Sequence, residues 1–205
     1  MSETLPQLVV ATRNKGKVAE IQRILAEVGA EIRLLSVSDF DIGEVEETGE
    51  TFEANALLKA ATIARATGLP ALADDSGLSV QALDGKPGIY SARWAGEHGN
   101  DFANVTKLLN DLQSVPESKR QASFIAVIAL ALPSGEHILA RGELAGQIRF
   151  QAAGSNGFGY DPIFQPEGDT RTLGQMRPDE KDAISHRARA LRELAPKIGT
   201  FISGR

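Results

Sequence analysis

The chain has 205 residues, of which 42% are hydrophobic and 24% are charged, as in an ordinary soluble globular protein. Its 22 basic and 27 acidic residues give a formal net charge of −5, which argues against a general nucleic-acid-binding surface. The absence of cysteine excludes disulfides, thiolate catalysis and cysteine-bound zinc. The longest apolar stretch, residues 124–132, is too short to span a bilayer, and the first residues lack the pattern of a signal peptide. We therefore expect a cytoplasmic protein without a membrane partner.

The first half of the chain alternates between apolar runs and helical patterns. Residues 8–11 are predicted to form a buried strand. Apolar residues at helical spacing then predict a helix that is capped by Asn14 and stops at Gly29. A short strand at residues 32–35 follows, and after a loop the next helix is predicted over residues 52–67.

The second half of the chain contains the longest predicted strand. A helix is predicted over residues 101–112, and the apolar, β-branched run at residues 121–132 is typical of a central strand. A turn leads from this run into residues 137–144, where apolar and polar residues alternate, so we expect a hairpin. The last helix is expected to open near Ser185 and to kink or break at Pro196, which costs a helix about 3 kcal/mol. Strands alternating with helices, plus one hairpin, predict an α/β domain with a mixed sheet.

The most informative segment is residues 72–77, in which a short apolar run leads into two adjacent carboxylates, a hydroxyl and a glycine. Successive side chains of a strand point to opposite faces, so Asp74 and Asp75 can both face water only if the strand ends there. Paired carboxylates at a strand end are suited to holding Mg²⁺ or to taking a proton from water. A surface turn is the alternative, because Asp, Ser and Gly also favour turns.

A second candidate segment, residues 12–17, joins the first strand to the first helix. Free backbone N–H groups at a helix start, with cations nearby, can bind phosphate. The segment lacks the glycine spacing of a Walker loop, so a capped turn with solvated lysines is the alternative. Its residues are Thr12, Arg13, Asn14, Lys15, Gly16 and Lys17.

Six acidic residues lie between residues 39 and 50, just before the helix predicted at residues 52–67. Their negative charge would repel a triphosphate unless a cation intervened. We therefore hypothesise a Mg²⁺ ion shared by Glu47 and Asp75. Lys59 lies four residues after Asn55 on one face of that helix. A lysine in mid-helix usually belongs to a solvated face.

Two segments in the last third of the chain combine polar and aromatic side chains. Residues 157–162 place two aromatics and a carboxylate among glycines, which let a ligand approach the backbone. Aromatic pairs are more often part of a core than a platform for a base, but a glycine-rich loop is poorly built for packing. Lys181, His186 and Arg187 offer donors to a carbonyl-rich ring or to phosphates, and a solvated helix start is the alternative.

Taken together, these segments resemble the inosine/xanthosine triphosphate pyrophosphatases, a Ham1-like family that acts on non-standard purine nucleotides. The resemblance rests on six segments in the family's order that span nearly the whole chain. These are residues 12–17, residues 47–52 with Asn55 and Lys59, residues 73–78, residues 87–93, residues 157–162, and Lys181 with residues 185–187. Arg13, at a variable family position, and Pro196 are small departures.

The resemblance implies a single domain over residues 1–205, with an elongated mixed β-sheet, flanking helices and two lobes around a central cleft. It also implies a Mg²⁺-dependent homodimer. The implied reaction is hydrolysis of ITP, dITP and XTP to the monophosphate and pyrophosphate, which keeps deaminated purines out of DNA and RNA. Two rival interpretations are a nucleotidase that removes the terminal phosphate and a nucleotide-binding module without turnover.

Residue roles follow from the same resemblance. Residues 12–17 would hold the triphosphate, and Ser76 and Lys59 would contact phosphates. Asp75 would be the catalytic base and a Mg²⁺ ligand, with Glu47 as a second metal carboxylate. The nucleoside pocket would be formed by Phe158, Gly159, Tyr160, Asp161, Lys181, His186 and Arg187.

Overall fold

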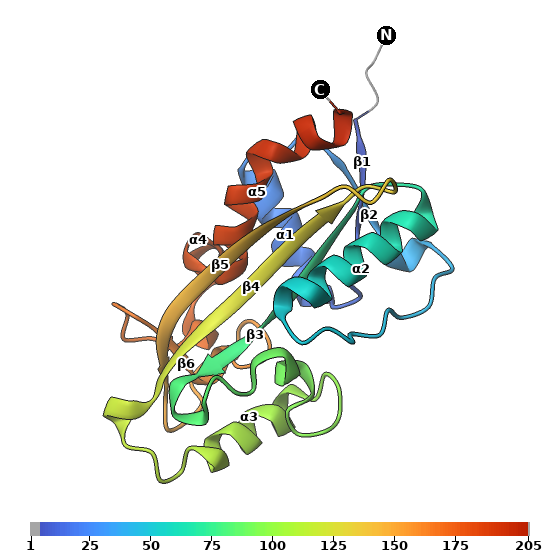
Figure 1. Cartoon of the computed structure of the whole chain (residues 1–205). Helices are drawn as coiled ribbons and strands as arrows, with labels where there is room; N and C mark the ends of the chain where they lie inside the picture. The colour runs from blue at the N-terminus through green and yellow to red at the C-terminus, as the bar shows by residue number, and fades with distance from the viewer. Residues whose placement is uncertain (1–4, 205) are drawn as a thin grey trace. The chain divides into compact units, whose positions relative to one another are not determined.

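The computed structural model describes residues 5–204, which contain five α-helices and six β-strands (Figure 1). The helices are α1 (Lys15–Glu27), α2 (Phe52–Thr67), α3 (Asp101–Asp111), α4 (Pro178–Ile184) and α5 (His186–Ser203). The strands are β1 (Gln7–Val10), β2 (Arg33–Ser36), β3 (Ala71–Val80), β4 (Gln121–Ala131), β5 (His137–Ile148) and β6 (Phe164–Pro166). None of the helices among the described residues has the length and apolarity needed to cross a membrane.

The six strands form one sheet in the order β2-β1-β3-β4-β5-β6. β1 pairs in parallel with β2 and with β3, whereas β5 and β6 are antiparallel. The mixed sheet with its flanking helices confirms the predicted α/β class. Two short elements, the seven-residue α4 and the three-residue β6, were not predicted, because neither is long enough for a periodic pattern.

The chain divides into two compact units. The first contains residues 5–75, 126–142 and 187–204, and the second contains residues 76–125 and 143–186. The expectation of a single domain over the whole chain stays a prediction.

In the first unit, α1 and α5 pack on strands of the sheet. Ile21 and Ile24 of α1 are fully buried against Leu8 of β1, and they share a core cluster with Leu191 and Leu194 of α5. Both predicted ends of α1 are confirmed, because the Asn14 side chain accepts from the Lys17 N–H and Gly29 follows the helix with a φ of 67°.

The helix α5 continues without interruption across Pro196, so the predicted break does not occur. The residues on either side explain why, since Leu194 and Ile198 are both fully buried in the core of the first unit. Burial of two large aliphatic side chains, each worth about 1.5–3 kcal/mol, offsets the helical hydrogen bond that a proline removes.

The second unit has a core of its own, in which α3 packs on strand residues. Leu108 of α3, Leu78 of β3 and Phe164 of β6 are fully buried and belong to one cluster. Phe124 of β4 joins this cluster with its ring centroid 4.6 Å from that of Phe164.

Candidate active site

The strand β3 carries the adjacent carboxylates, but it does not end at them. It runs without a break from Ala71 to Val80, and Asp74 and Asp75 are 1% and 6% exposed. The predicted strand end is therefore wrong, and so is the alternative of a surface turn. Both acids are tolerated inside a strand because each of them meets a cation on its own face of the sheet.

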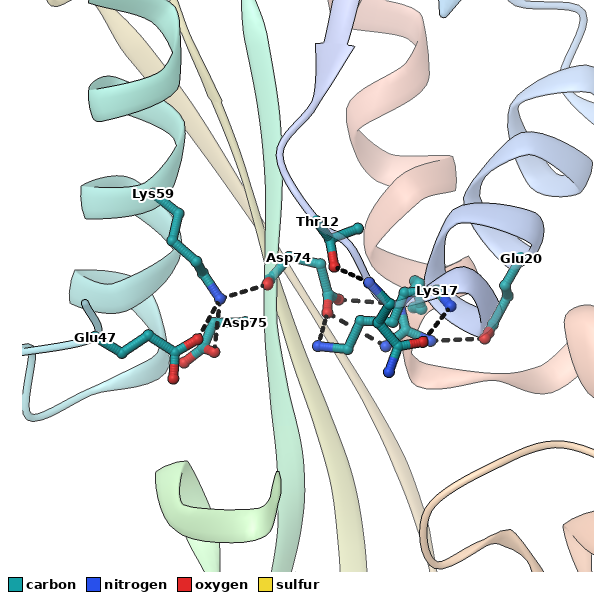
Figure 2. Close-up of polar contacts among 9 residues, drawn as sticks. Thr12, Lys17, Glu20, Glu47, Lys59, Asp74 and Asp75 are labelled. Atoms are coloured by element: carbon teal, nitrogen blue, oxygen red, sulfur yellow. Dashed lines mark hydrogen bonds and ion pairs between the residues drawn. The ribbon is translucent and has the colours of Figure 1, made fainter. Parts of the chain in front are cut away.

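Lys59 of α2 organises the face on which Asp75 lies. Its ammonium donates to Glu47 Oε1 at 2.8 Å, to Asp75 Oδ1 at 3.0 Å and to the backbone oxygen of Asp74 at 2.8 Å (Figure 2). Only 12% of the Lys59 side chain is exposed, so the interpretation of a solvated lysine is wrong. One ammonium thus brings together the two carboxylates that the sequence proposed as metal ligands.

Neighbouring charges shift the pKa values on this face in both directions. Burial lowers the pKa of Lys59, but the nearby carboxylates of Asp75 and Glu47 outweigh it, so the pKa is raised. Burial raises the pKa of Asp75, and Glu47 raises it further, against the opposing effects of Lys59 and Lys17. The Lys59 ammonium contacts both acids, and the second oxygen of Asp75 is buried without a hydrogen-bond partner.

These residues fit a Mg²⁺ ion. Mg²⁺ in proteins is usually held by one or two carboxylates, with water and phosphate oxygens as its other ligands. The buried, unpartnered Oδ2 of Asp75 and the neighbouring Glu47 carboxylate supply such a donor set. Among residues 5–204, no group of three or more His, Cys, Asp or Glu side chains gathers as a complete cage, so substrate oxygens would complete the coordination.

The opposite face of β3 holds a second ionic cluster, built around Asp74 (Figure 2). Its carboxylate accepts from Arg187 Nε at 3.0 Å and Nη2 at 3.3 Å, and it also pairs with Lys17 of α1. Arg187 Nη1 donates in turn to Glu20 Oε2 at 2.6 Å. Arg187, which the sequence placed in the nucleoside pocket, is 1% exposed and belongs to this cluster.

In the Asp74 cluster, ion pairs outweigh burial in setting the pKa values. Burial would raise the pKa of Asp74, but Arg187 and Lys17 hold it far below its usual range. Burial likewise lowers the pKa of Arg187, and the charges of Asp74 and Glu20 raise it above its ordinary value. Sequence reasoning missed Glu20, although residue 20 falls on the same helical face as Ile21 and Ile24.

The turn at residues 12–17 has the geometry of a capped helix start. Thr12 Oγ1 accepts from the Asn14 N–H at 3.2 Å, and Asn14 Oδ1 accepts from the Lys17 N–H at 3.0 Å. Lys15 is exposed and Gly16 half-buried. Arg13 donates to the backbone oxygen of Ile42 and so ties this turn to the acidic loop. A phosphate-binding role for the turn stays a prediction.

In the second unit, Asp161 connects the glycine-rich loop to α4. Its Oδ2 accepts from the Phe158 N–H at 2.9 Å and from Lys181 Nζ at 2.6 Å. The Lys181 ammonium also lies 4.4 Å from the centre of the Phe158 ring. A side chain at Gly157 would collide with this carboxylate, because an added Cβ would lie 2.0 Å from Asp161 Oδ2. The structure thus gathers a cation, a carboxylate and an aromatic ring.

The other predicted residues of the nucleoside pocket have structural contacts. Tyr160 is 4% exposed, belongs to the hydrophobic core and donates its hydroxyl to the backbone oxygen of Ser91 at 2.9 Å. The Gly159 N–H donates to Asp101 Oδ2 at 2.7 Å, a contact that sequence reasoning missed. The buried His186 ring stacks on Phe124, with centroids 4.8 Å apart. Ser76 is half-buried on β3.

A model of the Ham1 family matches residues 8–197, which include all of the predicted site residues. The chain belongs to the Ham1 family. Two curated relatives within it are named dITP/XTP pyrophosphatase. The one from Streptomyces avermitilis is 52% identical over 195 residues and covers 95% of this chain and 98% of its own. The one from Geobacter sulfurreducens is 53% identical over 196 residues, with the same coverage.

Solved structures of Ham1 proteins share the fold. A Ham1 protein from Coxiella burnetii superposes with a TM-score of 0.86 at 41% identity, covering 95% of this chain and 99% of that one. A dITP/XTP pyrophosphatase from Mycobacterium abscessus superposes with a TM-score of 0.75 at 47% identity, covering 94% and 99%. The predicted family and fold class are therefore confirmed.

Proposed function

We propose that this protein hydrolyses ITP, dITP and XTP to the nucleoside monophosphate and pyrophosphate, with Mg²⁺ as its cofactor. Membership of the Ham1 family and the names of the relatives support the reaction. One observation carries the proposed site: Glu47 and Asp75 converge on the Lys59 ammonium, and an oxygen of Asp75 is left buried without a partner.

In the proposed mechanism, Asp75 orients a water molecule toward the α-phosphorus and accepts its proton. Its raised pKa suits this role better than that of an ordinary surface carboxylate. Lys59 keeps Glu47 and Asp75 together in spite of their mutual repulsion. Glu47 and Asp75 would hold Mg²⁺, which when bound neutralises charge on the phosphate oxygens.

The base is proposed to be recognised by Lys181. Hypoxanthine and xanthine carry a 6-oxo acceptor, whereas adenine carries a 6-amino donor at the same position. Asp161 orients the Lys181 ammonium through a 2.6 Å contact, so a donor is already in place. A site built on such a hydrogen bond can reject the mismatched base by about 10⁴. The pocket would also use Phe158 and His186.

The cellular role follows from the reaction. Removing deaminated purine triphosphates would keep them from being incorporated into DNA and RNA, and we propose that the protein does this in the cytoplasm as a homodimer. Neither a nucleic-acid polymer nor a membrane is needed as a partner for that chemistry.

The test is a panel of ITP, dITP, XTP, GTP and ATP with Mg²⁺ in isotopically labelled water. We expect pyrophosphate and monophosphate as products from the first three, with the label in the monophosphate because water attacks the α-phosphorus. IDP and orthophosphate as products would establish the rival nucleotidase. Nucleotide binding that is unaffected by chelation and gives no product would establish a binding module.

A further inference from the structure

One buried polar side chain, Asn55, contacts the loop that carries Glu47 and has no part in the proposed mechanism. Asn55 in the first turns of α2 is 0% exposed. Its Oδ1 accepts from the Gly49 N–H at 2.7 Å, while its Nδ2 is buried without a hydrogen-bond partner. An unpaired buried amide costs about 1–3 kcal/mol, so this side chain is kept at a cost to stability.

The contact between Asn55 and Gly49 leaves no room for a side chain on the loop. A Cβ added at Gly49 would lie 2.7 Å from Asn55 Oδ1 and 2.8 Å from the Cβ of Ala54. Gly49 does not have a positive φ, so the need for glycine here comes from close packing and not from the backbone conformation. The loop backbone is therefore held directly on the surface of α2.

Glu47 lies two residues before this contact, in a stretch without helix or strand. Its carboxylate reaches Lys59, which lies four residues after Asn55 and so on the same face of α2. One helix face thus fixes both the backbone of the loop, through Asn55, and its carboxylate, through Lys59.

We propose that Asn55 is a positioning residue that clamps the loop at Gly49 and so holds Glu47 in place for a divalent cation. This inference deepens the proposed function and rests on its metal site. Without the clamp, Glu47 would have to be ordered when the cation binds. Loss of a contact that supports a metal ligand commonly lowers metal affinity by about 10-fold to 100-fold.

Two glycines of the same loop give a matched test. At Gly49 an added methyl group would collide with Asn55, whereas a Cβ at Gly43 would meet no heavy atom within 4 Å, and neither glycine has a positive φ. Mn²⁺ binding to the nucleotide-free protein, followed by electron paramagnetic resonance, reports on the site without turnover. We expect Gly49→Ala to weaken Mn²⁺ binding by about 10-fold or more, and Gly43→Ala to leave it unchanged.

Variants of Asn55 distinguish the loss of its hydrogen bond with Gly49 from a general loss of packing. Asn55→Leu removes the acceptor at similar volume and should weaken Mn²⁺ binding as Gly49→Ala does. Asn55→Asp keeps the acceptor and should recover affinity relative to Asn55→Leu. Equal Mn²⁺ affinity of Gly49→Ala and Gly43→Ala would overturn the clamp. Wild-type protein that binds Mn²⁺ but does not turn over ITP would overturn the proposed function alone.

Discussion

The two faces of β3 present the same residue type in opposite electrostatic states. On one face, the carboxylates of Asp74 and Glu20 meet the cations of Lys17 and Arg187. On the other face, Asp75 and Glu47 both contact the ammonium of Lys59. Burial does not distinguish the faces, since Asp74 and Asp75 are both nearly inaccessible. The direction of the pKa shift does, because the pKa of Asp74 is lowered and that of Asp75 is raised.

The difference assigns separate tasks to the two clusters. Removing one member of a buried ion-pair cluster leaves an uncompensated charge. On the other face, two carboxylates lie together and one oxygen of Asp75 is buried without a hydrogen-bond partner, which suits this pair to a cation. We infer that Asp74 serves the fold and that Asp75 serves the chemistry.

The largest expected effect is on turnover, from Asp75→Asn. The variant keeps the shape of the side chain but removes the base and a metal ligand, so kcat for ITP should fall by about 10⁴-fold. Stability should not fall, because the raised pKa of Asp75 means that its ionised form does not stabilise the fold, and Glu47 still contacts Lys59. Pyrophosphate release and urea unfolding measure the two quantities, with the exposed Asp41→Asn as control. Turnover close to that of the wild type would contradict the assignment.

The next largest effect is on stability, from Asp74→Asn. Arg187 and Lys17 would each lose a buried acidic partner, and breaking a buried ion pair costs about 3–5 kcal/mol. The free energy of unfolding in urea should therefore fall by that amount, whereas Asp75→Asn should leave it unchanged. A loss below about 1 kcal/mol, as for an exposed pair, would show that the comparison between the faces is mistaken.

The sequence predicts local structure well where local chemistry decides it. Asn14 and Gly29 bound α1 as expected, because a cap and a left-handed turn depend on neighbouring residues alone. The pairing of Glu47 with Asp75 came from a resemblance together with a charge argument. The structure brings both residues to Lys59.

The features that sequence reasoning missed depend on contacts between distant segments. The strand was expected to end at Asp74, because nothing local indicates that Arg187, more than one hundred residues later, neutralises it. The sequence favours a solvated Lys59 for the same reason, since its two acidic partners lie on other elements. Glu20 was overlooked because a charged residue on an apolar helix face becomes informative only once its partner is known.

The smallest effect is on the pH dependence of stability, and its sign differs between the two faces. Asp74 has a lowered pKa in the folded protein, so it binds fewer protons there than in the unfolded chain. Its contribution to stability is complete above the unfolded pKa, about 3.9, and is lost at about 1.4 kcal/mol per pH unit as the pH falls toward the folded value. Asp75 has a raised pKa, so its protonation favours the folded state as the pH falls.

The test is urea unfolding between about pH 5 and pH 2.5, where these carboxylates titrate. As the pH falls, the free energy of unfolding should decrease less steeply for Asp74→Asn than for wild type, and more steeply for Asp75→Asn. Parallel curves for the three proteins would mean that the two carboxylates are electrostatically equivalent.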